Sequence, residues 1–192
     1  MVSRARFRSF SRFPRGGSRV WTSTGDVSNN NFAHDFYIGP SSTSRTTNKT
    51  TSRYVRCVSG TGAARSFTDN GDGTITDNNT GLKWTMCPYG KTYSGGSCTG
   101  GAASHTWATA LSNCLALGGT WRLPSLNEYL SIMDFSRANP ALDPTYFNGH
   151  GRYWTSTTYN GSQGEAFSAQ TDYGYIYRNS KTGNRPYRCV SN

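Results

Sequence analysis

Apolar residues recur at helical spacing after Thr106. The side-chain oxygen of Thr106 can cap the start of this helix by accepting from a free backbone N–H of the first turn, and Gly118-Gly119 marks its end. The apolar positions are Trp107, Ala110, Leu111, Cys114 and Leu115. The pattern predicts an amphipathic helix with Cys114 on its buried face.

A second helix is predicted after the segment 122–124. Ser125 and Glu128 have the spacing of a capping box, and Asn139-Pro140 marks the stop. The apolar positions of its inward stripe are Leu126, Tyr129, Leu130 and Met133. Both predicted helices are short, so helices do not dominate the chain.

The other apolar residues favour short strands. Residues 67–84 predict a meander of three strands, because Asn-Gly and Asp-Gly pairs supply the positive φ values of hairpin turns. Three earlier strands are expected at Val20–Thr24, Phe32–Ile38 and Arg53–Val58, separated by Asn, Ser and Thr loops. Strands return from Tyr153 onward, with alternating aromatic residues at 172–177. The predicted fold class is α+β with short antiparallel strands.

The end of the chain repeats a segment near its start. RVWTST at 19–24 and RYVRCVS at 53–59 return as RYWTST at 152–157 and RPYRCVS at 185–191. The offset is 133 residues at the Trp and 132 at the Cys, so one loop residue differs between the copies. Such a long period indicates tandem globular domains. The predicted parts are a basic arm (1–18), the C-terminal half of a first copy (19–59), a linker (60–66) and a complete domain (67–192).

Composition and charge separate the two copies. Only 34% of the 192 residues are hydrophobic, and 22 Gly, 12 Tyr and 5 Trp indicate a small aromatic-rich core between polar loops. The net charge of +10 lies mainly in residues 1–66, whose only acids are Asp26 and Asp35. The Arg- and Phe-rich arm can grip a polyanion, or it can be a solvated, disordered terminus. Nucleic acid is not expected as a partner, because basic patches alone are weak evidence for it.

Cysteine spacing favours disulfides over a metal or redox site. The chain has no C-x-x-C pair, and its three histidines are scattered. Closing the Gly- and Ser-rich loop between Cys87 and Cys98 would stabilise the fold by about 3 kcal/mol on the chain-entropy model. Disulfides imply an oxidising compartment. No apolar signal segment or membrane-length apolar run is present, so the export signal is expected outside this chain or removed from it.

Three acids near the start of the complete domain allow two interpretations. Asp69, Asp72 and Asp77 fit turn chemistry, and they also resemble part of a calcium loop. An EF-hand loop needs twelve residues and a terminal bidentate Glu, which this segment lacks. Turn chemistry is preferred, calcium is kept as an alternative, and no other cofactor is expected.

The residues offer little for catalysis. His34, His105 and His150 lack a motif that would link them to a nucleophile. Glu128 and Glu165 could form an acid pair in space, but Glu128 is explained by its cap and Glu165 by a loop. We therefore expect a protein that is not an enzyme.

Six motifs in order give the complete domain a family resemblance. Over residues 67–191 they are FTDNGDGTITDNNTGLKW, the Cys-bracketed loop, TWATALSNC, WRLPSLNEY, YWTSTT and YRCV. In this order they resemble DUF1566, the Lcl C-terminal domain of the Legionella collagen-like adhesin. The domain also resembles the C-type lectin-like fold, including its formylglycine-generating-enzyme branch. That fold implies disulfides Cys114–Cys189 and Cys87–Cys98, which leaves Cys57 unpaired or intermolecular.

The resemblance implies binding rather than catalysis. Lcl-like proteins are bacterial surface adhesins implicated in sulfated polysaccharide recognition, so a secreted or cell-surface module that binds an anionic polysaccharide or a surface partner is expected. The calcium-dependent sugar motif of true C-type lectins is absent from the sequence. Contacts are expected from the loops 159–164 and 173–184, with the basic arm as auxiliary. The candidate ligand residues are Arg152, Arg178, Lys181, Arg185, Arg188, Tyr159 and Tyr173.

The incomplete first copy suggests an alternative function. The helix that should carry the partner of Cys57 is missing from it. A neighbouring protomer could supply the missing half, which would make the chain a homo-oligomer or a structural subunit of a surface filament.

Overall fold

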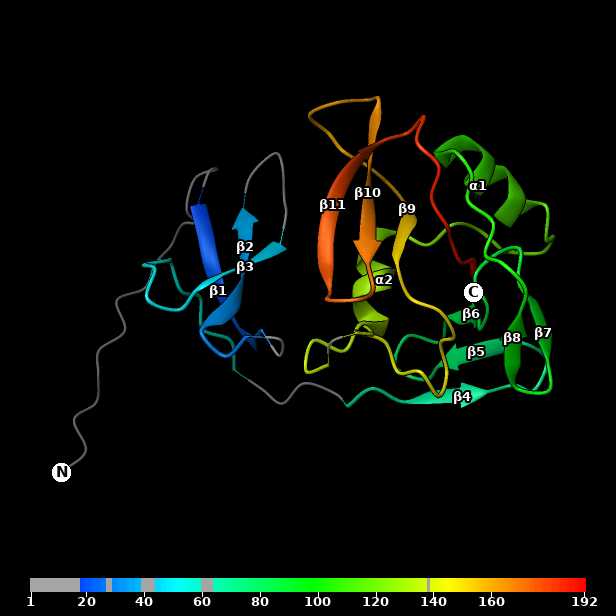
Figure 1. Cartoon of the computed structure of the whole chain (residues 1–192), viewed down its shortest axis with the longest axis horizontal. Coiled ribbons are helices and arrows are strands. Elements are labelled where there is room, and N and C mark those ends of the chain that lie inside the picture. The colour runs from blue at the N-terminus through cyan, green and yellow to red at the C-terminus, as the bar shows by residue number, and fades with distance from the viewer. Residues whose placement is uncertain (1–17, 27–28, 39–43, 60–63, 138) are drawn as a thin grey trace.

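The computed structural model describes residues 18–26, 29–38, 44–59, 64–137 and 139–192 (Figure 1). We call residues 18–59 the first unit and residues 64–192 the second unit. The basic arm, except for Ser18, and residues 60–63 of the predicted linker lie outside the described residues. The boundaries predicted for the two copies therefore stay a prediction, although the geometry of the two units can be compared.

The first unit is an antiparallel sheet in the order β1-β2-β3, formed by Ser18–Gly25, Phe32–Ile38 and Ser44–Asn48. The prediction of a strand at Arg53–Val58 is wrong. Within this segment only Tyr54 pairs with β1, through a single bridge to Val20. The third strand is β3, which the pattern treats as loop because it holds no apolar residue. Its register with β2 is continuous, which fits the strand preference of threonine.

Antiparallel sheets also build the second unit. The predicted meander is confirmed as β4 (Phe67–Asp69), β5 (Thr74–Asp77) and β6 (Lys83–Thr85), and β12 (Val190–Ser191) pairs with β6. A second sheet has the order β11-β10-β9, formed by Tyr175–Ser180, Glu165–Gln170 and Arg152–Thr158. The hairpin of β7 (Thr92–Ser94) and β8 (Ser97–Thr99) lies in the Cys-bracketed loop. With its two helices, the unit has the predicted α+β character.

Both predicted helices and their N-terminal caps are confirmed. Helix α1 spans Trp107–Leu115 and helix α2 spans Leu126–Ile132, with Thr106 and the Ser125–Glu128 capping box at their starts. Two details differ. Leu115 is 64% exposed and lies off the buried face of α1. Helix α2 ends well before Asn139, because the buried Met133 takes extended backbone and the next N–H donates to the carbonyl of Ala141.

Two disulfides hold the second unit, and they are the pairs that the family resemblance implies. Cys87 is bonded to Cys98, and Cys114 of α1 is bonded to Cys189 just before β12. Cys57 in the first unit is an exposed free thiol. The second bridge joins α1 to the end of the chain, next to the fully buried Trp154.

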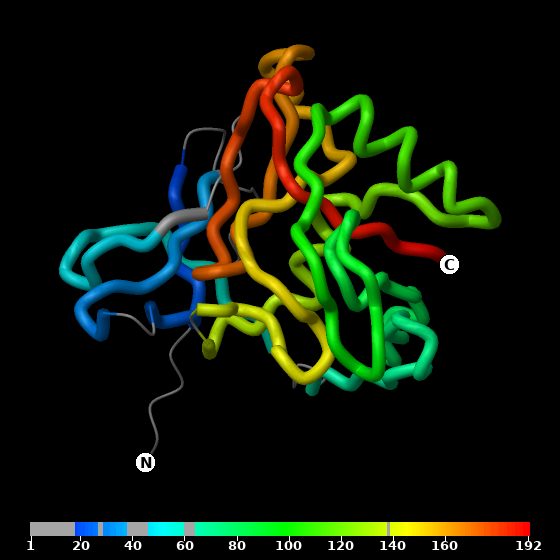
Figure 2. The backbone as a smooth tube through the Cα atoms, turned by 45° about the vertical axis from the view of Figure 1, so that its right-hand side comes forward, coloured from blue at the N-terminus to red at the C-terminus, as the bar shows by residue number. Residues whose placement is uncertain are grey.

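The first unit packs beside strand β11 and helix α2 of the second unit (Figures 1 and 2). Phe36 joins a small core with Leu126, Leu130 and Ile176. The ring of His34 lies against Phe135 and Tyr175, and burial lowers its pKa. A cavity of about 160 Å³ remains between these residues, so the packing is not complete.

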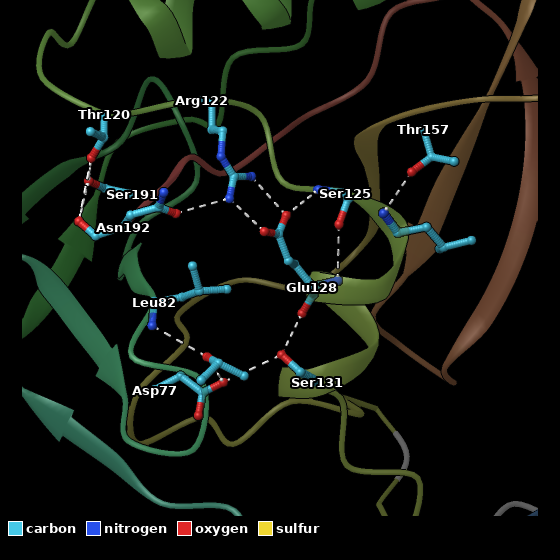
Figure 3. A network of polar contacts seen from close by, with 12 residues as sticks. Asp77, Leu82, Thr120, Arg122, Ser125, Glu128, Ser131, Thr157, Ser191 and Asn192 are labelled. Carbon is cyan, nitrogen blue, oxygen red and sulfur yellow. Dashed lines mark hydrogen bonds and ion pairs between the residues drawn. The ribbon is translucent and has the colours of Figure 1, made fainter.

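A polar network fixes the start of helix α2 (Figure 3). Arg122 donates to both carboxylate oxygens of Glu128, at 2.9 and 2.6 Å, and Glu128 also accepts from the backbone N–H of Ser125. Arg122 further donates to the side chain of Asn192, which ties the end of the chain to the helix. Ser131 links the same helix to Asp77 at the end of β5.

Glu128→Ala is expected to destabilise the protein by about 2 kcal/mol at pH 7, because it removes the glutamate half of the capping box and the charge-assisted bonds from Arg122. The hydrogen bonds from Arg122 lower the pKa of Glu128 from 4.5 to about 2. This stabilisation is therefore present above pH 4.5 and is lost as the pH falls toward 2. Urea unfolding at pH 7 and near pH 2 measures it. Glu165→Ala is the control and should cost little at either pH, and a Glu128→Ala loss that persisted unchanged near pH 2 would contradict the account.

The β1–β3 sheet has the same local geometry as the β9–β11 sheet. Trp21 is opposite Asp35 in the first sheet, and Trp154 is opposite Ser168 in the second sheet. Trp154 and Ser168 each lie 133 positions after their counterparts in the first sheet. A β-bulge interrupts the register at the matching place in both sheets. The N–H of Trp21 donates to the carbonyl of Tyr54 at 2.9 Å, as that of Trp154 does to Pro186 at 3.0 Å. These matches agree with the offset in the sequence.

Candidate ligand-binding surface

Four cationic side chains of the second unit lie over aromatic rings on or beside the β9–β11 sheet. The pairs, with the distance from the cation to the ring centroid, are Arg152–Tyr177 at 3.8 Å, Lys181–Trp107 at 4.0 Å, Arg178–Tyr159 at 4.6 Å and Arg185–Trp154 at 5.6 Å. Contacts of this kind contribute about 0.5–1 kcal/mol each at exposed sites. They hold long side chains in fixed positions, which lowers the entropy lost when a ligand binds.

Three of these pairs belong to one side of the sheet. Arg152 and Trp154 are two residues apart in β9, so they point to the same face of the sheet. Tyr177 lies on that face too, because Tyr177 and Trp154 are both paired with Ser168. Trp107 packs against the cluster around Trp154 and donates its indole N–H to the carbonyl of Thr155. We call Arg152, Tyr177, Lys181, Trp107, Arg185 and Trp154 the cation–aromatic surface. Arg178 and its ring lie on the opposite face.

The cations of this surface lack acidic partners among the described residues. Neither Arg152 nor Arg185 forms an ion pair there, and Lys181 donates to the hydroxyl of Thr158 at 3.0 Å. Burial, and then the charge of Arg152, lower the pKa of Arg185. The Nε–H of Arg185 is buried and makes no hydrogen bond to any described residue. The surface therefore carries positive charge that no carboxylate of the described chain neutralises.

The prediction that Arg188 contacts the ligand is wrong. Its side chain is fully buried, and its guanidinium donates to the backbone carbonyls of Thr85, Met86, Asn148 and Gly149. The sequence pattern does not reveal this, because Arg188 alternates with apolar neighbours as an exposed strand residue would.

The two candidate tyrosines have different surroundings. Tyr159 is 9% exposed and packs on Phe167. Tyr173 is exposed and stacks on Tyr175, whose ring meets Tyr177 edge-on, so it extends the cation–aromatic surface by a row of rings. The alternating aromatic residues at 172–177 carry the signal for this row. Trp107 is missed as a surface residue, because its position in the helical stripe predicts only core packing.

The acids proposed for calcium and two of the histidines make hydrogen bonds or close contacts to other residues of the second unit. Asp69 and Asp72 each accept from a backbone N–H two residues ahead, as does Asp77, which is the predicted turn chemistry. Three or more potential metal ligands do not come together anywhere among the described residues. His105 lies 3.0 Å from the hydroxyl of Tyr187, and His150 contacts Asp172.

A large cleft lies elsewhere. It has a volume of about 770 Å³, is lined by both units, and brings together Asp26, Arg65 and Asp134. Its mixed charge does not favour a polyanion. None of the cation–aromatic residues lines it.

The fold and this surface define a disulfide-bridged α+β module with a partly exposed cationic and aromatic face around the buried Trp154. The family model of the Lcl C-terminal domain matches residues 73–191, which is most of the second unit, and the chain belongs to this family. Among curated proteins, none matches the chain significantly. Membership indicates an adhesin-like surface module. Neither helix in the described part of the chain has the length and apolar character to cross a membrane.

Proposed function

We propose that this protein is an extracellular binding module that recognises an anionic, sulfated polysaccharide and is not an enzyme. The observation that carries the proposal is the cation–aromatic surface, where Arg152, Lys181 and Arg185 are held over rings without acidic partners among the described residues. Guanidinium groups suit oxyanions because their planar N–H donors match the spacing of the oxygens. Family membership supports a surface location.

A C-type lectin-like architecture is part of this proposal. The bridge from α1 to Cys189 and the pairing of β12 with β6 bring the end of the domain back to its beginning, which supports that assignment. Calcium is not required by the proposed mode of binding, because the positive charge comes from the side chains.

Retention on immobilised heparin tests the proposal. The protein is expected to bind at low ionic strength and to elute as salt rises, because screening weakens contacts between exposed charges. No retention, or retention that does not depend on salt, would contradict electrostatic recognition of a sulfated polysaccharide.

A second function, as an assembly subunit, is favoured by the exposed end of the first unit. Tyr54, Val55 and Val58 are 62%, 67% and 95% exposed. At the matching positions of the second unit, Tyr187 and Val190 are buried under α1 and β6. The exposed apolar residues and the free Cys57 would be covered by a strand and a cysteine-bearing helix from another half-domain.

Non-reducing electrophoresis discriminates this second function. Assembly through the first unit predicts disulfide-linked species that Cys57→Ser abolishes. A monomer whose Cys57 thiol still reacts with a thiol reagent after oxidation would contradict assembly and would leave the binding module as the function.

A further inference from the structure

The first unit contains a buried carboxylate held by two arginines. Asp35 is fully buried, and it accepts from the Nε–H of Arg53 at 2.8 Å, from Arg19, and from the hydroxyl of Thr47 at 2.9 Å. These hydrogen bonds, with the charge of Arg19, lower the pKa of Asp35 against the opposing effect of burial. Each arginine side chain is about one-fifth exposed, at 20% for Arg19 and 18% for Arg53. The pair forms a clamp that encloses one carboxylate.

Both arginines of this clamp have a counterpart in the second unit, but the carboxylate that they enclose does not. Arg152 takes the position of Arg19, two residues before the tryptophan, and Arg185 takes the position of Arg53, one residue before the carbonyl that bonds that tryptophan. Ser168 takes the position of Asp35 and bonds Asn179 at 2.6 Å, as Asp35 bonds Thr47. A second pair of equivalent bonds runs from Thr22 to His34 and from Thr155 to Phe167, at 2.9 and 2.8 Å.

The second unit therefore keeps two arginines and loses their anion. The Nε–H of Arg53 donates to Asp35, whereas the Nε–H of Arg185 is buried without a partner among the described residues. Two nearby cations without a counter-charge are unfavourable, because each disfavours the charged form of the other. An oxyanion between them would remove this cost and accept from Arg185.

We propose that Arg152 and Arg185 form an oxyanion subsite that takes a carboxylate or sulfate group of an acidic polysaccharide in the place that Asp35 occupies in the first unit. This inference rests on the proposed polysaccharide binding and narrows it to one subsite beside Trp154 and Tyr177. Because Ser168, Trp154 and the Nε–H of Arg185 are buried, the subsite requires the Arg185 side chain to turn outward when the ligand binds. Arg178, on the opposite face, is not part of the subsite.

Ser168→Asp tests the subsite by supplying its anion from within the chain. The introduced carboxylate would be held by Arg152 and Arg185, as Asp35 is held by Arg19 and Arg53, so ligand affinity should fall at least about tenfold, which is 1.4 kcal/mol. Binding is measured with two probes, a polysaccharide that carries only carboxylates and dextran sulfate, which carries only sulfates. The probe whose binding falls identifies the group that the subsite takes.

Ser168→Asn is the matched control, since it has the size of Asp without the charge. It should bind the probe that the subsite takes more tightly than Ser168→Asp does. Ser168→Asp should also be the more stable of the two, because Ser168 is fully buried and an unpaired carboxylate there would cost several kcal/mol.

The outcomes separate the subsite from the general proposal. If the unaltered protein binds neither probe, the proposed function fails, and the subsite fails with it. If it binds, but Ser168→Asp binds as tightly as Ser168→Asn, the subsite is overturned and the general proposal stands. Lower stability of Ser168→Asp than of Ser168→Asn would also overturn the subsite, because the arginines would then not reach the carboxylate.

Discussion

Cys114→Ser is expected to lower the free energy of unfolding by about 4 kcal/mol, since the Cys114–Cys189 bridge closes a loop of 75 residues. The bridge joins α1 to the last segment of the chain, where Ala110, Trp154 and Tyr187 share one buried cluster. In the chain-entropy model the loss comes from the larger freedom of the unfolded chain. Urea unfolding under non-reducing conditions measures it.

Two other cysteines provide graded controls for this prediction. Cys87→Ser should cost about 3 kcal/mol, because its bridge closes a separation of only 11 residues. Cys57→Ser should leave the stability of the monomer unchanged, because that thiol is exposed and unbonded. Equal losses for Cys114→Ser and Cys57→Ser would show that the long bridge does not stabilise the fold.

Arg188→Met is expected to lower the free energy of unfolding by about 3–5 kcal/mol, because a buried acceptor left without its donor costs about 1–3 kcal/mol. Methionine keeps much of the length of the side chain but none of its donors. The carbonyls of Thr85, Met86, Asn148 and Gly149 would lose the group that links β6 to the loop before β9. Each buried acceptor left unsatisfied adds to the cost.

Arg178→Met is the matched control for Arg188. Arg178 is exposed and makes no ion pair to a described residue, so its replacement removes only the contact with the ring of Tyr159 and should change stability by no more than about 1 kcal/mol. Thermal or urea unfolding compares the two variants. Similar stability for both would contradict a structural role for Arg188 and would return it to the set of ligand candidates.

Local sequence signals predict the elements whose chemistry is local. Thr106 and the Ser125–Glu128 box fix the helix starts, because caps act within four residues. Asn-Gly and Asp-Gly give the β4–β6 meander for the same reason. Strand β3 is missed because its pairing with β2 is set by tertiary structure, and residues 53–58 are overpredicted because most of them have no strand to pair with.

The candidate site is only partly visible in the sequence. Basic residues near the end of the chain can be listed from the sequence, but their exposure depends on contacts across the fold. Arg188 turns inward to four carbonyls, whereas Arg152 and Arg185 stay partly exposed. Arg152 lies over Tyr177, and Arg185 lies over the buried Trp154. The role of Ser168 is visible only when the registers of the two sheets are compared, because no local pattern relates it to Asp35.

The location of polysaccharide binding is the central claim, and a charge-matched comparison on immobilised heparin tests it most directly. One triple variant removes Arg152, Lys181 and Arg185 as alanines, and the other removes Lys83, Lys91 and Arg137, so both lose three positive charges. The first should bind at least about tenfold more weakly than the second. Equal weakening of both would show that only net charge matters and would contradict recognition by the cation–aromatic surface.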